Sequence, residues 1–225
     1  MHTEILAYTA TNPGAAGAAA AAVTGDTLTI KNNRGVSGPR IIDFYGQQAT
    51  AGFQQLIFPS GHDTTRGFRV GQIPDDTYSH LALGTSIPIT AQETIAVTIA
   101  GGAAETDVGA LLVHYPDLPG IDQRVLTWAQ LNARYEKLTT VFSAVTSGAG
   151  AWGTAVAINS VSDLLLANRD YAILGITTTV DQLAVAVTGP DTGNVRIGSP
   201  GSNQNTDESA SYFAMMSRAH DMALI

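Results

Sequence analysis

One pattern of strand, turn and strand occurs twice in this chain and restricts its fold more than any other feature. Residues 55–71 contain the apolar stretch QLIF, a turn with Asp63 and Thr64, and the stretch FRVG; residues 182–198 contain QLAV, a turn with Asp191 and Thr192, and VRIG. Because turn length fixes the register of a β-hairpin, similar spacing in the two copies indicates the same local structure. The copies are too far apart for a solenoid repeat, whose period is ~20–50 residues. We therefore predict one β-plan built twice.

Further segments have the apolar alternation of half-buried strands. In residues 26–32, Leu28 and Ile30 share one face, and residues 93–100 alternate in the same way. Residues 108–115 are almost entirely apolar, which is typical of a strand covered on both faces. In all, eight strands are predicted in the first half, at 4–10, 26–32, 40–47, 52–58, 68–73, 78–83, 93–100 and 108–115. Eight antiparallel strands in two sheets is the strand count of a jelly roll.

Two of these segments are less regular, and one run has no clear assignment. Residues 4–10 alternate weakly, as an edge strand does, and residues 78–83 fit either a strand or one helical turn. The run of small residues from Ala15 to Val23 is expected either to pack closely against another backbone or to stay mobile.

A different kind of segment separates the two copies. Residues 116–120 form a Pro- and Gly-containing linker, after which Thr127 and Gln130 have the spacing of a helix capping box. The apolar residues that follow recur at intervals of three and four, which predicts one helical stripe: Trp128, Leu131, Tyr135, Leu138 and Phe142. We expect this helix to be a structural element that packs at the junction of the two β-units.

These patterns predict an all-β fold of two jelly-roll-like β-sandwich units joined by a linker and one amphipathic helix. The first unit is residues 1–116, the linker and helix are residues 117–146, and the second, shorter β unit is residues 147–225. The second unit is short by about two strands, because no segment matches residues 93–100 or 107–115 of the first. Those strands are expected to come from a neighbour or from the first unit, unless the chain is trimmed.

Composition limits the function classes. Only 13% of the residues are charged, which favours a subunit that buries much of its surface against copies of itself, although a polar secreted β-sandwich has a similar composition. The net charge of −8 and the 11 unclustered basic residues argue against a nucleic-acid partner. The sequence has no cysteine for a disulfide or thiolate site, no recognisable secretory signal and no predicted transmembrane segment.

Paired Asp-Thr turns in a doubled β-chain suggest an aspartic protease, in which two carboxylates share one proton. The match fails, because the first copy continues with Thr65 where that family needs the glycine present at Gly193. A turn aspartate that accepts backbone hydrogen bonds explains both copies. Arg69 and Arg196 occupy matching positions and are expected to pair with acids or to extend from a strand edge, as part of the repeated architecture.

Other candidate sites also have simpler explanations. The GxGxxG pattern at residues 148–153 lacks the preceding strand and following helix of a dinucleotide site. Pairs of acidic residues at 75–76 and 207–208 could hold calcium, but solvated turn residues account for them. The histidines have no metal-ligand spacing: His2, His62, His80, His114 and His220. No serine lies in a G-x-S-x-G motif. We predict no catalytic residue, no cofactor and no metal site.

The doubled strand–turn–Arg–Gly unit, with its Pro-Gly linker and helix, resembles the double jelly-roll major capsid proteins of tailless icosahedral phages and related viruses. The resemblance covers most of the chain but depends on architecture, because the family has no diagnostic motif or catalytic residues to compare. It implies two units side by side, three subunits in a pseudo-hexagonal capsomer, and minor capsid proteins as further candidate partners. A single jelly roll with added β-structure is the alternative architecture.

The sequence therefore predicts a non-enzymatic, self-assembling structural protein of a virion, put together in the host cytoplasm. The alternative is a carbohydrate- or receptor-binding β-sandwich of the tail-fibre or adhesin type. Exposed aromatic residues on a single face would favour that alternative, whereas aromatics make up only 7% of this chain and are scattered.

Overall fold

The computed structural model describes the larger part of the chain. The described ranges are residues 3–11, 17–30, 39–47, 52–60, 67–72, 79–100, 106–114, 128–134, 151–158, 171–176, 184–189, 196–200 and 211–220, with shorter pieces between 138 and 178. The predicted Asp-Thr turns at Asp63 and Asp191 lie outside the described residues.

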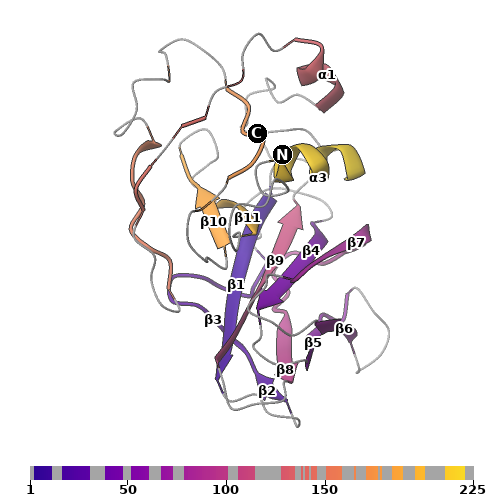
Figure 1. Ribbon diagram of the computed structural model, residues 1–225. Helices are drawn as coiled ribbons and strands as arrows, with labels where there is room; N and C mark the ends of the chain where they lie inside the picture. Colours follow the sequence, from indigo (N-terminus) through magenta and orange to yellow (C-terminus); the bar gives the residue numbers. More distant parts are fainter. Residues whose placement is uncertain are drawn as a thin grey trace.

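The described strands form two antiparallel sheets (Figure 1). The seven-stranded sheet has the order β10-β11-β1-β9-β4-β7, with β3 also pairing with β1. Its strands are β1 (Thr3–Thr11), β3 (Ala21–Ala22), β4 (Arg40–Gln47), β7 (Ser79–Pro88), β9 (Thr106–His114), β10 (Ala184–Val187) and β11 (Ile197–Pro200). The four-stranded sheet has the order β2-β8-β5-β6, made of β2 (Ala18–Ala19), β8 (Ala96–Ala100), β5 (Gly52–Ile57) and β6 (Phe68–Gln72). The predicted all-β class is confirmed.

Apolar side chains fill the space between the two sheets. Leu6, Tyr8 and Ala10 point inward from β1, as expected for every second residue of a strand. They pack against Leu56 of β5 and Val97 of β8, and all of these side chains are buried. The remaining buried members of this cluster are Leu28, Ile30, Ile41, Phe58, Ile89, Ile95, Ile99, Leu111 and Val113. Burial of Leu28, Ile30, Ile95, Val97 and Ile99 confirms the two predicted alternating faces.

The seven-stranded sheet also has a covered outer face. Ile5 and Ala7 of β1 and Ala110 of β9 point away from the first core and are buried under the C-terminal part of the chain. Ile197 of β11 belongs to the same buried cluster. The residues packed over this face include Tyr212, Phe213 and Met216, with Trp152, Ile173 and Leu174 around them. The nearly unbroken apolar sequence of residues 108–115 follows from this double burial, as predicted.

Two helices lie on this outer side. Helix α1 (Trp128–Asn132) is only a fragment of the predicted helix, and Leu138 of the predicted stripe is 76% exposed. Trp128 and Leu131 do pack against the outer core. Helix α3 (Tyr212–His220), yellow in Figure 1, was not predicted. The Trp128 amide N–H donates a hydrogen bond of 3.1 Å to Ser217 Oγ of α3, so Ser217 caps the start of α1.

Both copies of the repeated pattern form hairpins, β5–β6 and β10–β11, as predicted. Their predicted equivalence is wrong. Val70 pairs with Gln54, 16 positions earlier, whereas its counterpart Ile197 pairs with Val187, ten positions earlier. The hairpins also join different sheets, because β5 pairs with β8 while β11 pairs with β1. In the described residues after 147, the strands extend the sheet of the first unit.

Several other local predictions differ from the structure. The strand at 4–10 is central in its sheet, because β9 pairs with one edge and β3 and β11 pair with the other. Residues 79–83 belong to the strand β7, which confirms the strand alternative for this segment. Residues 26–30 form one isolated bridge, Thr29 to Thr94, rather than a strand, and the alanine-rich run supplies β2 and β3 instead. Residues 154–158 and 171–176, whose sequences loosely match the predicted strands at 27–32 and 40–46, form no strand.

Candidate functional site

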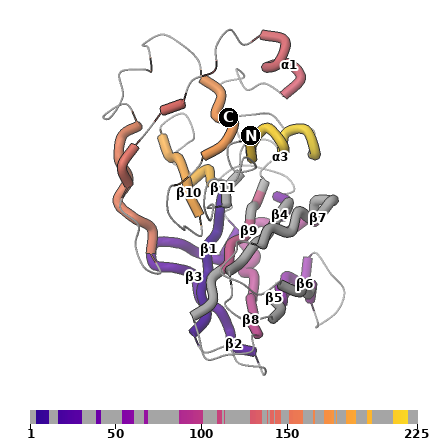
Figure 2. The backbone as a smooth tube through the Cα atoms, in the orientation of Figure 1, coloured from indigo at the N-terminus to yellow at the C-terminus, as the bar shows by residue number. Residues whose placement is uncertain are grey.

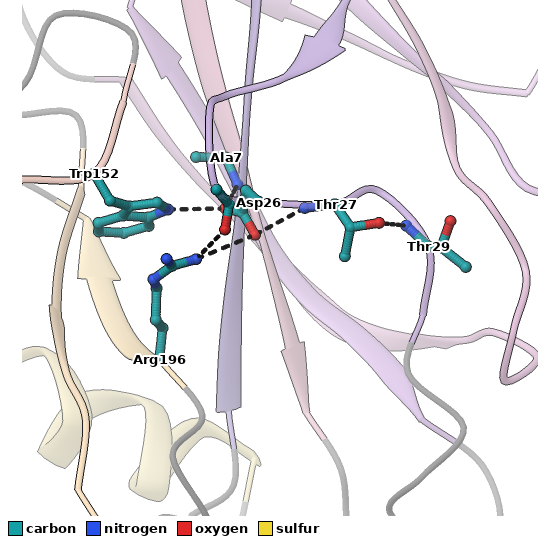
Figure 3. Close-up of polar contacts among 7 residues, drawn as sticks. Ala7, Asp26, Thr27, Thr29, Trp152 and Arg196 are labelled. Carbon is teal, nitrogen blue, oxygen red and sulfur yellow. Dashed lines mark hydrogen bonds and ion pairs between the residues drawn. The ribbon is translucent and has the colours of Figure 1, made fainter.

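An extensive polar cluster among the described residues is centred on Asp26. Its side chain is 3% exposed. Oδ2 accepts a hydrogen bond from the Ala7 amide N–H at 2.8 Å and another from the Trp152 indole N–H at 3.1 Å (Figure 3). Oδ1 accepts from the Thr27 amide N–H at 3.0 Å. A buried carboxylate needs such donors, because its desolvation is otherwise too costly.

Arg196 completes this cluster from the start of β11. Its Nη1 lies 3.8 Å from Asp26 Oδ1 and donates a hydrogen bond to the Gly25 carbonyl oxygen at 2.8 Å. The guanidinium carbon is 5.0 Å from the centre of the Trp152 ring, a cation–π distance. The Arg196 side chain is 33% exposed, so the ion pair is partly screened by solvent. We call Asp26, Trp152 and Arg196 the Asp26 junction.

Local backbone geometry brings these three residues together. Gly25 has a φ of +85°, a left-handed conformation that glycine adopts without strain, and the turn it makes directs Asp26 toward β1. Trp152 follows Ala151, which forms a parallel bridge with Thr24. Arg196 precedes Ile197, which pairs with Glu4 of β1. Figure 3 shows Trp152 and Arg196 approaching Asp26 from the same side, opposite Thr27 and Thr29.

This geometry suits attachment rather than catalysis. Both Asp26 oxygens are occupied by protein donors, and the side chain is withdrawn from solvent. Residues far apart in the sequence converge on it, since Trp152 and Arg196 come from the part of the chain that covers the outer face of the seven-stranded sheet. The Asp26 junction therefore ties that covering layer to the β-sandwich.

A second polar contact is buried between the sheets. The Tyr8 hydroxyl donates a hydrogen bond to Gln54 Oε1, and both side chains are fully buried. Burial raises the pKa of Tyr8 well above its ordinary value, because the phenolate would be poorly solvated there. Gln54 Nε2 has no hydrogen-bond partner among the described residues. An unpaired buried amide is costly, so this site is a specific weak point of the core.

A third cluster joins two loops at the surface. Glu93 accepts hydrogen bonds from the Ser60 amide N–H at 3.0 Å and the Thr90 amide N–H at 3.3 Å, and its carboxylate also contacts the Ser60 hydroxyl. The Thr90 amide N–H lies 2.9 Å from Ser60 Oγ as well. The cluster fixes the chain after β5 against the turn before β8.

The structure describes few of the residues weighed from sequence. The acidic pairs at 75–76 and 207–208 lie outside the described residues, as do His2, His62 and residues 148–150 of the GxGxxG pattern. The backbones of His80, His114 and His220 lie in β7, β9 and α3. Arg196 pairs with an acid, Asp26, which is the first of the two roles predicted for it. The side chain of Arg69 lies outside the described part of the structure.

The Asp26 junction itself was missed by sequence reasoning. Asp26 was assigned only to the start of a strand, and Trp152 was noticed only inside a glycine pattern. A Gly-Asp-Thr turn was the one local signal, because aspartate in such turns accepts nearby backbone N–H groups. Contacts over 126 positions, such as Trp152 with Asp26, leave no mark in sequence spacing.

Comparison with known proteins adds no family to this picture. No protein-family model matches the chain, and searches of curated proteins and of solved structures find no significant match. In the part of the chain that the structure describes, no three His, Cys, Asp or Glu residues are grouped as a metal site would require. In the same part, no helix is both long and apolar enough to cross a membrane.

Proposed function

We propose that this protein is a structural subunit that assembles with copies of itself into a viral coat. The observation that carries the proposal is the strand order of residues 3–114. One sheet contains β1-β9-β4-β7, and the other contains β2-β8-β5-β6. Strands that hold the same position in these two orders are consecutive in the chain, apart from the short β3. The pairs are β1 with β2, β9 with β8, β4 with β5, and β7 with β6. This strand order supports our interpretation of residues 3–114 as an eight-stranded jelly roll, the architecture of many capsid subunits.

The filled interior supports a structural role over a binding one. Jelly rolls also serve as lectins and as cupins, whose sites require convergent polar groups in a concave surface. Here the inner faces of the two sheets are occupied by Leu, Ile, Val and Phe side chains, and Tyr8 is bonded to Gln54. A close-packed core of this kind provides a rigid block suited to repeated assembly.

The low charge supports assembly with identical copies. With 13% charged residues, the chain has few groups whose desolvation would oppose the formation of large contacts. Following the resemblance to double jelly-roll capsid proteins, we expect a homotrimer within the shell of a virion. The architecture that accounts for the described strands is one jelly roll with an added β10–β11 hairpin and an outer layer.

Sedimentation velocity and electron microscopy of the purified protein test this proposal. The expected result is a concentration-dependent oligomer, with trimers or closed particles visible at high concentration. Stable subunit contacts of this kind bury on the order of 1,000 Å² or more. A protein that stays monomeric from micromolar to near-millimolar concentration would refute the proposal.

The strand order also fits a carbohydrate- or receptor-binding module, which is the second candidate. Among the described residues, Tyr171 is the one strongly exposed aromatic side chain, at 42%. Binding to an array of glycans by a protein that forms no oligomer would favour this second candidate.

A further inference from the structure

Charge is absent from one long stretch of this acidic chain. All 25 residues from 138 to 162 are uncharged, whereas the protein as a whole carries a net charge of −8. We call residues 138–162 the uncharged segment. Two copies of an acidic protein repel each other, and contact costs least where neither copy carries charge. The uncharged segment is the longest stretch of the sequence that meets this condition.

The same segment exposes apolar side chains. Five large apolar side chains are strongly exposed in the described part of the chain, and three of them belong to the segment: Leu138 at 76%, Val145 at 59% and Val156 at 38%. Residues 153–157 are all exposed, and their side chains are small or β-branched. Small residues such as Gly153, Ala155 and Ala157 permit close approach of another backbone. Exposed large apolar side chains gathered in one stretch of chain make it a candidate interaction site.

Residues 151 and 152 of the segment are also held in place before any partner arrives. Trp152 fixes it to the body of the protein through its bond to Asp26, and Ala151 is bridged to Thr24. Figure 2 shows residues 151–158 as an extended tube at the side of the molecule, with one end beside β3. Binding to a fixed segment costs less entropy than binding to a mobile one.

From these three observations we infer that the exposed, described residues of the uncharged segment, which include Leu138, Val145 and residues 153–157, form the surface through which this chain contacts a second copy of itself. The inference rests on the proposed self-assembly and assigns it to particular residues. A strongly basic partner would instead be drawn to the acidic remainder of the surface, so a second copy is the occupant that the charge pattern favours.

Charge substitutions on the segment test the inference. Leu138→Asp and Val156→Asp each place a carboxylate at an exposed apolar position. In a contact between two copies of the variant, this carboxylate would be desolvated and would be repelled by the carboxylate introduced into the other copy. Met215→Asp is the matched control, because Met215 is exposed to the same degree as Val156, 37% against 38%, but lies in α3. Sedimentation velocity should show association weakened by about tenfold or more for the first two variants and unchanged for the control. Circular dichroism and thermal melting establish that all three variants are folded.

A spectroscopic measurement gives a second readout. The chain has no cysteine, so Val156→Cys and Met215→Cys can each be labelled at a single position with an environment-sensitive dye. On association the emission of the dye at position 156 should shift to shorter wavelength, while that at 215 stays constant.

The outcomes separate this inference from the proposed function. A wild-type protein that never associates defeats both. If the wild-type protein associates and the Leu138→Asp and Val156→Asp variants associate equally well, self-assembly stands and the assignment to the uncharged segment is wrong. Equal weakening by Met215→Asp, or equal dye shifts at both positions, also overturns the assignment.

Discussion

The indole N–H of Trp152 donates a hydrogen bond of 3.1 Å to Asp26 Oδ2 across 126 positions of sequence. Ala7 of β1 and Arg196 meet the same carboxylate, so three distant parts of the chain depend on one side chain. The outer layer of the protein is thus attached by a polar contact as well as by apolar packing.

Substitution of Asp26 should therefore destabilise the whole protein. Asp26→Ala leaves the Ala7 and Trp152 N–H groups without their acceptor, and we expect the free energy of unfolding to fall by about 3 kcal/mol. Urea denaturation followed by Trp fluorescence measures this change. Glu93→Ala, which removes a carboxylate from a more exposed cluster, is the control and should cost about 1 kcal/mol. Equal losses in the two variants would show that the Asp26 junction has no special importance.

The buried Tyr8–Gln54 pair should show strong coupling. Tyr8→Phe takes the hydroxyl donor from a fully buried amide, and Gln54→Leu leaves the Tyr8 hydroxyl unpaired, so each should cost about 1–3 kcal/mol. The double variant removes both polar groups, and its loss should be smaller than the sum by about 1 kcal/mol or more. Chemical denaturation of the four proteins supplies the cycle, and additive losses would contradict the contact.

The same tyrosine should make the protein sensitive to alkali. Burial raises the pKa of Tyr8 in the folded state, whereas the unfolded chain releases this proton near the ordinary tyrosine pKa of about 10. The contribution of Tyr8 to the free energy of unfolding is present in full below about pH 10. It is lost as pH rises toward the folded-state pKa, at about 1.4 kcal/mol per pH unit. Unfolding free energies between pH 9 and 11 should therefore fall more steeply for the wild type than for Tyr8→Phe. Parallel curves for the two proteins would be the contrary result.

Substitution by alanine should destabilise the protein at Gly198 of β11 but have little effect at Gly189, which follows β10. A Cβ at Gly198 would lie 2.4 Å from Ile5 Cγ2, inside the outer core, so Gly198→Ala should cost about 1–3 kcal/mol by overpacking. A Cβ at Gly189 would meet nothing within 4 Å, and Gly189→Ala is the control with an expected effect below about 1 kcal/mol. Thermal melting distinguishes them, and a tolerated Gly198→Ala would mean that β11 does not pack closely on β1. Partial recovery in Ile5→Val with Gly198→Ala would confirm the cause.

Alternation in the sequence was sufficient for much of the sandwich. Ile95, Val97 and Ile99 share the buried face that their period of two predicted, and the apolar run around Leu111 is covered on both faces. These predictions succeeded because the side chains themselves determine which face is buried. Most strand boundaries in the first half followed from the same pattern.

Other elements depend on contacts that sequence spacing does not record. β2 and β3 are formed by alanines, whose low strand propensity conceals them, and their pairing with β8 and β1 decides their conformation. β1 looked like an edge strand because its alternation is weak, but it is weak because Ile5 and Leu6 are buried on opposite faces. The repeated hairpin fixed local structure only, since the partner strands differ. The Asp26 junction needed the tertiary fold to be seen at all.

The double burial of β1 has a consequence for synthesis on the ribosome. β1 is synthesised before its partners: it pairs with β9 only after residue 106 has been made, and it receives its outer cover only when residues 173–216 have been made. Throughout that interval, Ile5 and Ala7 of the nascent chain lack the side chains that cover them in the fold. The nascent protein therefore has to be kept from aggregating, or from pairing with neighbouring nascent chains, until residue 216 has been translated.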